Sequence, residues 1–319
     1  MPIFVFEFDP LLRLGDLAIR WEAIGIAGSI LFALLLAVVL GRRGGPGSGP
    51  RTERYRADDL LYIALGAVPG AVVGGRLGYV LHHLDYYGAD TGAIMDPAQG
   101  GLQLSLAVLG GTLTGGYVAA LVGASVRGWM HVAALPLLLA IEGGKAAMAW
   151  GGSGQGVAST DLPRTAYLGP GPWGSLGPAI PSVPSQLLEA GAVAVAGIVL
   201  VALMAAGGFR RRDGRLYLAA AALWLAGRLL IAATWRDPAA VGPLNVDQVI
   251  SVALLGAVAV AWFVVGRRAG PDSATTSAID GPAWPDETAI GVLRRPEPAA
   301  APPGPGASDP PDRASSGEG

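Results

Sequence analysis

The sequence predicts an all-α, polytopic membrane protein with seven transmembrane helices, its N-terminus outside the cell and its C-terminus in the cytoplasm. Of the 319 residues, 52% are hydrophobic and only 14% are charged, a composition too apolar for a soluble domain. Long uncharged stretches recur along the chain, and arginines gather in alternate connections between them. The absence of cysteine excludes disulfides and catalysis by a protein thiol.

Seven stretches approach the roughly 20 residues that a helix needs to cross a bilayer. The first carries no charge after Glu22 and has no obvious small-residue cleavage site, so we interpret it as a retained anchor. The fourth contains Pro136, a kink that neighbouring helices can accommodate. The helices are expected at Glu22–Leu40, Leu60–Leu81, Leu102–Val126, Met130–Trp150, Leu187–Ala206, Leu216–Thr234 and Val249–Val265.

The arginines outside these stretches set the orientation, because positive residues concentrate in cytoplasmic loops. The second, fourth and sixth connections carry only Arg164 and Arg236. The N-terminal segment, which should lie on the same side, holds Arg13 and Arg20 as a weak opposing signal. The first, third and fifth connections and the segment after the last helix are therefore cytoplasmic. They contain Arg42, Arg43, Arg51, Arg54, Arg56, Arg127, Arg210, Arg211, Arg212, Arg215, Arg267 and Arg268.

Three cations lie within the apolar stretches: Arg76, Lys145 and Arg228. A charge at bilayer depth costs about 2.5–3.5 kcal/mol, so such residues usually face a wet cavity or a site. With this orientation all three lie toward the outer leaflet. They are expected to share one cavity for an anionic ligand such as a phospholipid headgroup. Alternatively, Lys145 forms a structural pair with Glu142, one helical turn away.

The remaining segments divide the chain into a membrane domain, residues 1–268, and a Pro/Ala/Gly-rich cytoplasmic tail, residues 269–319. The tail lacks apolar periodicity, so it is expected to be disordered and carries no chemistry. The connection Gly151–Gln186 is long enough to be functional. No metal-ligand spacing and no basic–aromatic stripe occurs, so we expect no metal, no cofactor and no nucleic-acid partner.

Several short motifs together are more specific than any one of them. In chain order they are Ile19-Arg20-Trp21, Gly74-Gly75-Arg76-Leu77-Gly78-Tyr79, Gly100-Gly101, Asp161-Leu162-Pro163, Pro184-Ser185-Gln186-Leu187 with Glu189, and Gly227-Arg228. Their order and spacing, over about residues 8–265, resemble the prolipoprotein diacylglyceryl transferases. The resemblance implies a multi-pass protein of the bacterial cell membrane, with its site at the outer leaflet.

What the resemblance implies is transfer of a diacylglyceryl group from phosphatidylglycerol to the lipobox cysteine of a preprolipoprotein signal peptide. The products would be a thioether-linked lipid and glycerol phosphate, formed by a monomer. Arg228, Glu189 and Lys145 are the expected catalytic residues. The phosphatidylglycerol headgroup would be bound by Arg76, Lys145, Arg228, Gln186, Ser185 and Gly156, with Glu189 and Gln186 near the rim of the cavity.

The sequence departs from the family's pattern where proton transfer is expected. Ser105 aligns with the family's helix-three histidine, and Lys145 replaces an arginine. A catalytically impaired paralogue that binds phospholipid or lipoprotein therefore remains an alternative, and a small-solute transporter a weaker one. His82 or His83 could instead replace the missing base. The other replaced positions are Glu22, Met148, Ser153, Val183 and Ala232.

Overall fold

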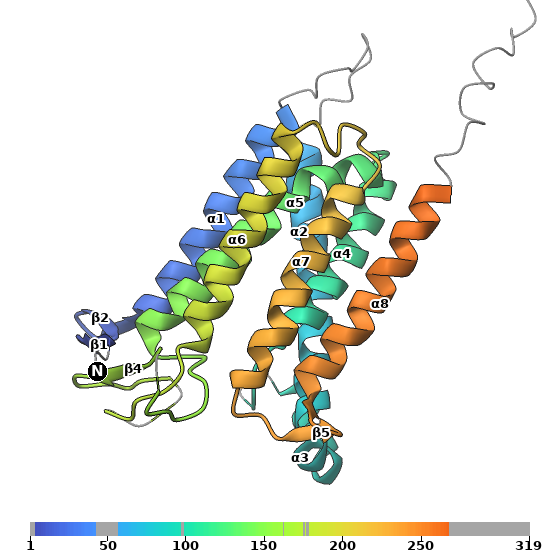
Figure 1. Ribbon diagram of the computed structural model, residues 1–319. Helices are drawn as coiled ribbons and strands as arrows, with labels where there is room; N and C mark the ends of the chain where they lie inside the picture. The colour runs from blue at the N-terminus through green and yellow to red at the C-terminus, as the bar shows by residue number, and fades with distance from the viewer. Residues whose placement is uncertain are drawn as a thin grey trace, which may run out of the picture. The chain divides into compact units, whose positions relative to one another are not determined.

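Seven helices long and apolar enough to cross a membrane occur in the described part of the chain, which confirms the predicted fold class (Figure 1). The computed structural model describes residues 4–42, 57–96, 99–161, 163–174, 176 and 179–267. Arg43, Arg51, Arg54, Arg56, Arg268 and the predicted tail 269–319 lie outside the described residues. The helices are α1 Trp21–Arg42, α2 Ala57–His82, α4 Leu104–Leu121, α5 Val126–Met148, α6 Ser185–Ala205, α7 Arg215–Ile231 and α8 Val246–Arg267.

The largest difference from the expected helix bounds is at the end of α4, which was predicted to continue to Val126. The helix ends at Leu121 because Gly123 adopts a left-handed conformation with φ of 73°. The hydroxyl of Ser125 then accepts a hydrogen bond from the Gly128 N–H at 3.2 Å and caps the start of α5. Apolar composition alone did not reveal this turn.

Short strands and helices occupy the connections, although the sequence predicted no strands. β1 (Phe4–Glu7) pairs in parallel with β4 (Thr165–Leu168). β2 (Leu11–Leu14) and β3 (Leu17–Arg20) form a hairpin. Strands this short leave no alternation long enough to identify. The other short elements are β5 Ala239–Val241, which pairs with β6 Leu244–Asn245, α3 Leu84–Ala89, η1 Thr91–Met95, η2 Ala149–Gly151 and η3 Ala232–Thr234.

Helices α2 and α4 pack closely through glycines. A side chain added at Gly70 or Gly74 would meet the backbone of α4, and one at Gly110 would meet the backbone of α2. Small residues at a helix crossing allow this approach, which gains van der Waals contact in a lipid environment. This pair forms one wall of the bundle, and α1 packed on α5 forms another.

The main core lies between α5, α6 and α7, where Leu138, Leu200, Leu216 and Trp224 are buried. The outward faces of the helices instead expose large apolar side chains such as Phe32 and Phe263, as expected of surfaces in contact with lipid. Neighbouring helices run in opposite directions. As a result, the ends of α2, α5 and α7 meet the starts of α4, α6 and α8 at one end of the bundle (Figure 1), hereafter the polar end.

Candidate functional site

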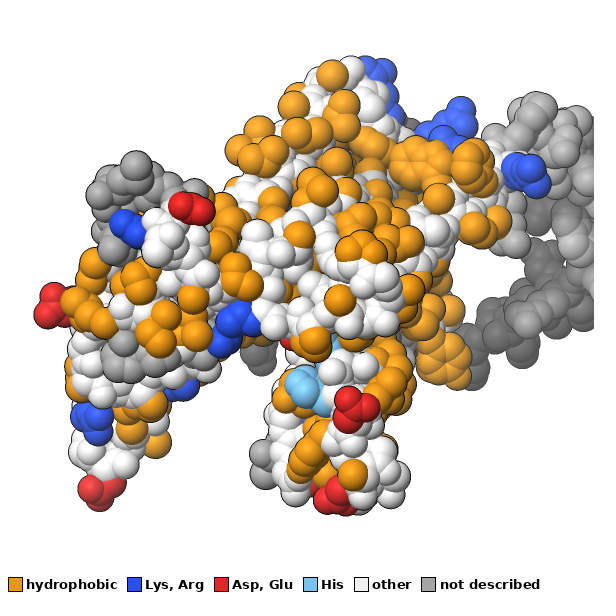
Figure 2. All heavy atoms as spheres, turned by 60° about the horizontal axis from the view of Figure 1, so that its bottom comes forward, with side chains coloured by type: hydrophobic (Ala, Val, Ile, Leu, Met, Phe, Trp, Pro, Cys, Tyr) orange, Lys and Arg blue, Asp and Glu red, His pale blue; other side chains and the backbone are white. Residues whose placement is uncertain are grey.

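A cavity of about 1130 Å³ extends through the bundle to the polar end. Most of its length is lined by apolar residues of α1, α2, α4 and α5, such as Ile30, Ala64 and Pro136. At the polar end its lining is polar: Tyr79, His82, His83, Gln103, Lys145, Gln155, Gln186, Glu189, Arg228, Arg236, Asp237 and Asp247. In Figure 2 this end is hollowed between two projecting lobes, with a basic side chain on one lobe and a histidine on the other.

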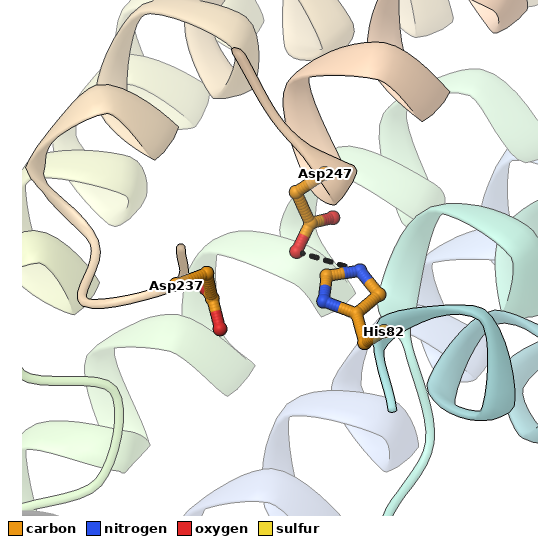
Figure 3. Close-up of side chains that lie close together, drawn as sticks. All are labelled: His82, Asp237 and Asp247. Carbon is orange, nitrogen blue, oxygen red and sulfur yellow. Dashed lines mark ion pairs between the residues drawn. The ribbon is translucent and has the colours of Figure 1, made fainter. Parts of the chain in front are cut away.

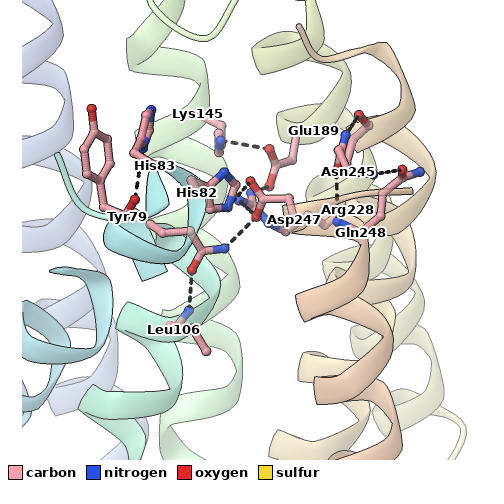
Figure 4. A network of polar contacts seen from close by, with 12 residues as sticks. Tyr79, His82, His83, Leu106, Lys145, Glu189, Arg228, Asn245, Asp247 and Gln248 are labelled. Atoms are coloured by element: carbon pink, nitrogen blue, oxygen red, sulfur yellow. Dashed lines mark hydrogen bonds and ion pairs between the residues drawn. The ribbon is translucent and has the colours of Figure 1, made fainter. Parts of the chain in front are cut away.

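Four charged side chains form a buried network at the polar end (Figure 4). The Lys145 ammonium lies 2.8 Å from Oε2 of Glu189. One terminal guanidinium nitrogen of Arg228 lies 2.6 Å from Oε1 of the same carboxylate, and the other lies 2.9 Å from Oδ1 of Asp247. Two cations thus face two carboxylates, so the network is neutral and each buried charge has a partner of opposite sign.

In this network Arg228 bridges acids of α6 and α8. The network also corrects two expectations. Lys145 pairs with Glu189 of α6, so the alternative pair with Glu142 on its own helix is not formed. Glu189 is not at a rim either, because only 1% of it is exposed. It lies between the two cations and holds both in place.

Asp247 belongs to the same site, although the sequence placed it in a connection. Asn245 and Gln248 exchange backbone-to-side-chain hydrogen bonds of 3.1 and 2.9 Å, which fix the first turn of α8. Gln103 donates to Oδ1 of Asp247 at 2.6 Å and accepts from the Leu106 N–H at 2.7 Å, so it also caps α4. An acid beside amide side chains at a helix start was the signal that could have identified Asp247.

Arg76 does not share the cavity with Lys145 and Arg228. Its guanidinium donates to the backbone carbonyls of Ile94, Ala93, Asp96 and Gln99 at 2.7–2.9 Å. Four carbonyl acceptors satisfy most of its donors. The expected three-cation cluster is therefore a cluster of two, and Arg76 instead holds the connection between α2 and α4 in place. Its position near the end of α2 places Arg76 at the same end of the bundle as Lys145 and Arg228, but its side chain points to this connection.

The remaining predicted ligands divide into one that lines the cavity and two that support it. Gln186 lines the cavity and donates to the Tyr167 hydroxyl at 3.0 Å. Burial raises the pKa of Tyr167 to about 12, so this phenol remains protonated. Ser185 is fully buried and shares a 2.6 Å hydrogen bond with Thr234. Gly156 donates to Val183 at 2.8 Å, and a side chain there would collide with Ser185 and Thr234.

The fold and the cavity define a multi-pass membrane protein with a buried, charge-paired site at one end of its bundle. A family model described as prolipoprotein diacylglyceryl transferase matches residues 10–264. The chain therefore belongs to the prolipoprotein diacylglyceryl transferase family, transferases that act on prolipoproteins in lipoprotein maturation.

Of three relatives with this function in their names, two match along nearly their whole length and one over a shorter segment. The phosphatidylglycerol–prolipoprotein diacylglyceryl transferase of Acaryochloris marina is 27% identical over 285 residues, 86% of this chain and 97% of the relative. That of Trichormus variabilis is 28% identical over 287 residues, 85% of this chain and 94% of the relative. That of Streptococcus pneumoniae is 39% identical over a shorter segment of 111 residues, 34% of this chain and 37% of the relative.

Two of the positions that depart from the family's pattern contact each other. The Ser153 hydroxyl donates to Oε2 of Glu22 at 2.7 Å. Arg20 lies 3.2 Å from the same oxygen and donates to the Gly151 carbonyl at 2.9 Å. The carboxylate of Glu22 thus joins Arg20 to Ser153 at the start of α1.

Proposed function

We propose that this chain transfers a diacylglyceryl group from phosphatidylglycerol to the lipobox cysteine of prolipoproteins. The reaction forms a thioether and releases glycerol phosphate. One observation carries the proposal: the Lys145–Glu189–Arg228–Asp247 network lies at the polar end of a cavity whose remaining lining is mostly apolar. A donor with two acyl chains and a phosphate headgroup needs both environments in one cavity.

The apolar part of the cavity suits the acyl chains of the donor. It follows α2 from Leu60 to Tyr79, which at 1.5 Å per residue is about 28 Å. The walls formed by α1 with α5 and by α2 with α4 carry small and branched apolar residues on this side. Chains lying there would bring the glycerol backbone and its phosphate toward the polar end.

The polar part suits the phosphate and the charge that develops on it. Lys145 lines the cavity with 12% of its side chain exposed, whereas the Arg228 side chain is only 3% exposed. The ammonium is therefore the more accessible donor, with Gln186 beside it. Arg228 is almost fully buried and acts through its charge, since a fixed positive charge in a dry site stabilises the leaving phosphate. Glu189 positions both cations.

The proposed location of the site is the outer leaflet. The structure has Arg42, Arg127, Arg215 and Arg267 at helix ends opposite the polar end. Positive residues favour the cytoplasm, so the polar end would face outward, where the signal peptide of a preprolipoprotein presents its cysteine. We propose that the chain works there as a monomer.

The other interpretations have less support. The comparisons give no support to the interpretation of the chain as a catalytically impaired paralogue. A transporter is expected to place its binding site near the midplane of the membrane, whereas the charged residues of this cavity gather at one end of the bundle.

Complementation tests the proposal. The gene should restore lipoprotein processing in a bacterial strain depleted of its own transferase, and Arg228→Met should not. Arg13→Met is the matched control, because Arg13 lies in β2 with 60% of its side chain exposed and, among the described residues, pairs with nearby Asp9. A wild-type gene that is inserted in the membrane but restores no processing would contradict the proposal.

A further inference from the structure

We propose that His82 accepts the proton of the incoming thiol and that Asp247 positions its imidazole. This inference rests on the function proposed above. A cysteine thiol has an ordinary pKa near 8.5, so few molecules are thiolate at neutral pH without a base. The reaction therefore requires a proton acceptor beside the headgroup site.

The geometry of His82 fits this role (Figure 3). It is the last residue of α2, lines the polar part of the cavity, and its side chain is 9% exposed. Its Nε2 lies 3.3 Å from Oδ2 of Asp247, the carboxylate oxygen that Arg228 and Gln103 do not occupy. The negative charge of this carboxylate favours the proton on Nε2, so the imidazole keeps the lone pair on Nδ1 for the thiol.

Other side chains in the described lining are less suitable acceptors. Glu189 contacts two cations, and Asp247 contacts Arg228 and Gln103. An ion-paired carboxylate holds its charge and accepts a proton poorly. His83 is exposed, stacks on Tyr79 at 4.3 Å and places Nδ1 3.0 Å from the Tyr79 carbonyl oxygen. Asp237 is exposed, and one of its carboxylate oxygens lies within 4.8 Å of ligand atoms of both His82 and Asp247 (Figure 3).

The chemical step moves one proton and replaces one carbon–oxygen bond with a carbon–sulfur bond. His82 Nδ1 takes the proton of the cysteine thiol, and the sulfur uses the released electron pair to form a bond to the glycerol carbon. The bond from that carbon to the phosphate oxygen breaks, and its electron pair leaves with glycerol phosphate beside Lys145 and Arg228. The imidazolium then passes its proton to the departing phosphate, which restores the neutral base.

The same side chains resemble a metal site, since one ligand atom from each of His82, Asp237 and Asp247 lies within 4.8 Å of the others. A divalent cation there would lie beside the guanidinium of Arg228, which is 2.9 Å from Asp247. Repulsion between the cation and this guanidinium, which is paired to the same carboxylate, disfavours the metal, so the geometry favours proton transfer.

The test compares His82→Gln with His83→Gln in the full-length purified protein, using phosphatidylglycerol vesicles and a lipobox peptide. At pH 7 the first variant should lose about 100-fold or more in kcat, the usual contribution of a general base, with KM for phosphatidylglycerol changed less than about threefold. The second should lose much less kcat than the first, because His83 is exposed and its Nδ1 faces the Tyr79 carbonyl. If the wild type shows no turnover in the same assay, the proposed function fails. If the wild type turns over and His82→Gln is equally active, only this inference fails.

The pH profile separates a base from a structural residue. In the wild type, kcat should fall as acid protonates His82, whose charged surroundings are Asp247 on α8, Asp237 in the α7–α8 connection, Arg228 on α7 and neighbouring His83. The defect of His82→Gln should shrink above about pH 9, where the thiol ionises unaided. A defect equal at all pH values overturns the proposal, as does full activity of the variant.

Two further results decide cases that the variants alone leave open. If His82→Gln does not accumulate, restored activity of His82→Ala in added imidazole supports the proposal, and the absence of rescue at a normal protein level overturns it. If EDTA abolishes wild-type activity and Zn²⁺ restores it, His82 is a metal ligand and the proposal is wrong.

Discussion

Charge neutrality is the main property of the site at the scale of single residues. Arg228 and Lys145 are stabilised in the bundle because Glu189 and Asp247 accompany them. Removing one member of such a buried set leaves an uncompensated charge, which costs about 3–5 kcal/mol. The acids therefore have a structural role in addition to any catalytic one, and substitutions that conserve charge are the most informative.

Lys145→Arg should retain activity, whereas Lys145→Met should lose it. Arginine keeps the pairing with Glu189, fits the family's pattern, and can hold phosphate through two parallel hydrogen bonds. Methionine removes a charge-assisted contact of roughly 1.5–3 kcal/mol, which is about a 10- to 100-fold effect. The rate at which each variant modifies a lipobox peptide measures its activity. Equal activity of the methionine variant would remove Lys145 from the site.

Arg76→Lys should loosen the connection between α2 and α4 without abolishing headgroup binding. A lysine cannot replace a guanidinium that bonds to carbonyls of Ala93, Ile94, Asp96 and Gln99 at once. Limited proteolysis should cut residues 84–99 faster in the variant than in wild type. Unchanged proteolysis combined with loss of phosphatidylglycerol binding would return Arg76 to the headgroup site.

At the scale of elements, the helices were predictable and their side-chain directions were not. Seven apolar stretches of membrane length leave little choice of fold. The fold then brings Lys145, Gln186, Glu189 and Arg228 together, since all lie near helix ends at one level of the bundle. Arg76 lies at the same level, but its side chain points to the connection between α2 and α4. Asp247 was missed because, in the sequence, an acid in the first turn of a helix looks like a residue of the preceding loop.

The glycine contact between α2 and α4 should be sensitive to a single methyl group. In Gly110→Ala the new Cβ would meet the Gly70 backbone, and such overpacking costs about 1–3 kcal/mol. Gly28→Ala on α1 is the control, since nothing lies within 4 Å of a Cβ there, and alanine favours a helix by about 1 kcal/mol. Thermal unfolding in detergent should show a lower Tm for the first variant only. Equal Tm values would mean that α2 and α4 do not pack closely.

At the scale of the whole molecule, the arrangement suits a reaction between two membrane-held substrates. The cavity joins an apolar region between α1, α2, α4 and α5 to a charged region formed by the ends of six helices. Lipid chains can therefore stay in an apolar environment while the headgroup reacts. The short strands β1 and β4 lie beside this end, where Tyr167 of β4 holds Gln186. These long-range contacts join distant segments and leave no local pattern in the sequence.

The orientation of the molecule is testable by reporter fusions. A reporter placed after about Gly208, between α6 and α7, should be cytoplasmic, and one after about Gly169, in the connection between α5 and α6, should be external. The physical reason is the concentration of Arg210, Arg211 and Arg212 in the first of these connections. The reverse pattern would place the polar end in the cytoplasm and exclude an outer-leaflet site.

The most direct measurement is mass spectrometry of a lipobox peptide incubated with purified protein and phosphatidylglycerol vesicles. The peptide should gain one diacylglyceryl group on its cysteine, with one glycerol phosphate released per peptide modified. Arg228→Met should form neither product, whereas Arg13→Met should match wild type. An unmodified peptide in the presence of folded wild-type protein, or modification that persists in Arg228→Met, would contradict a transferase site built on the Arg228 network.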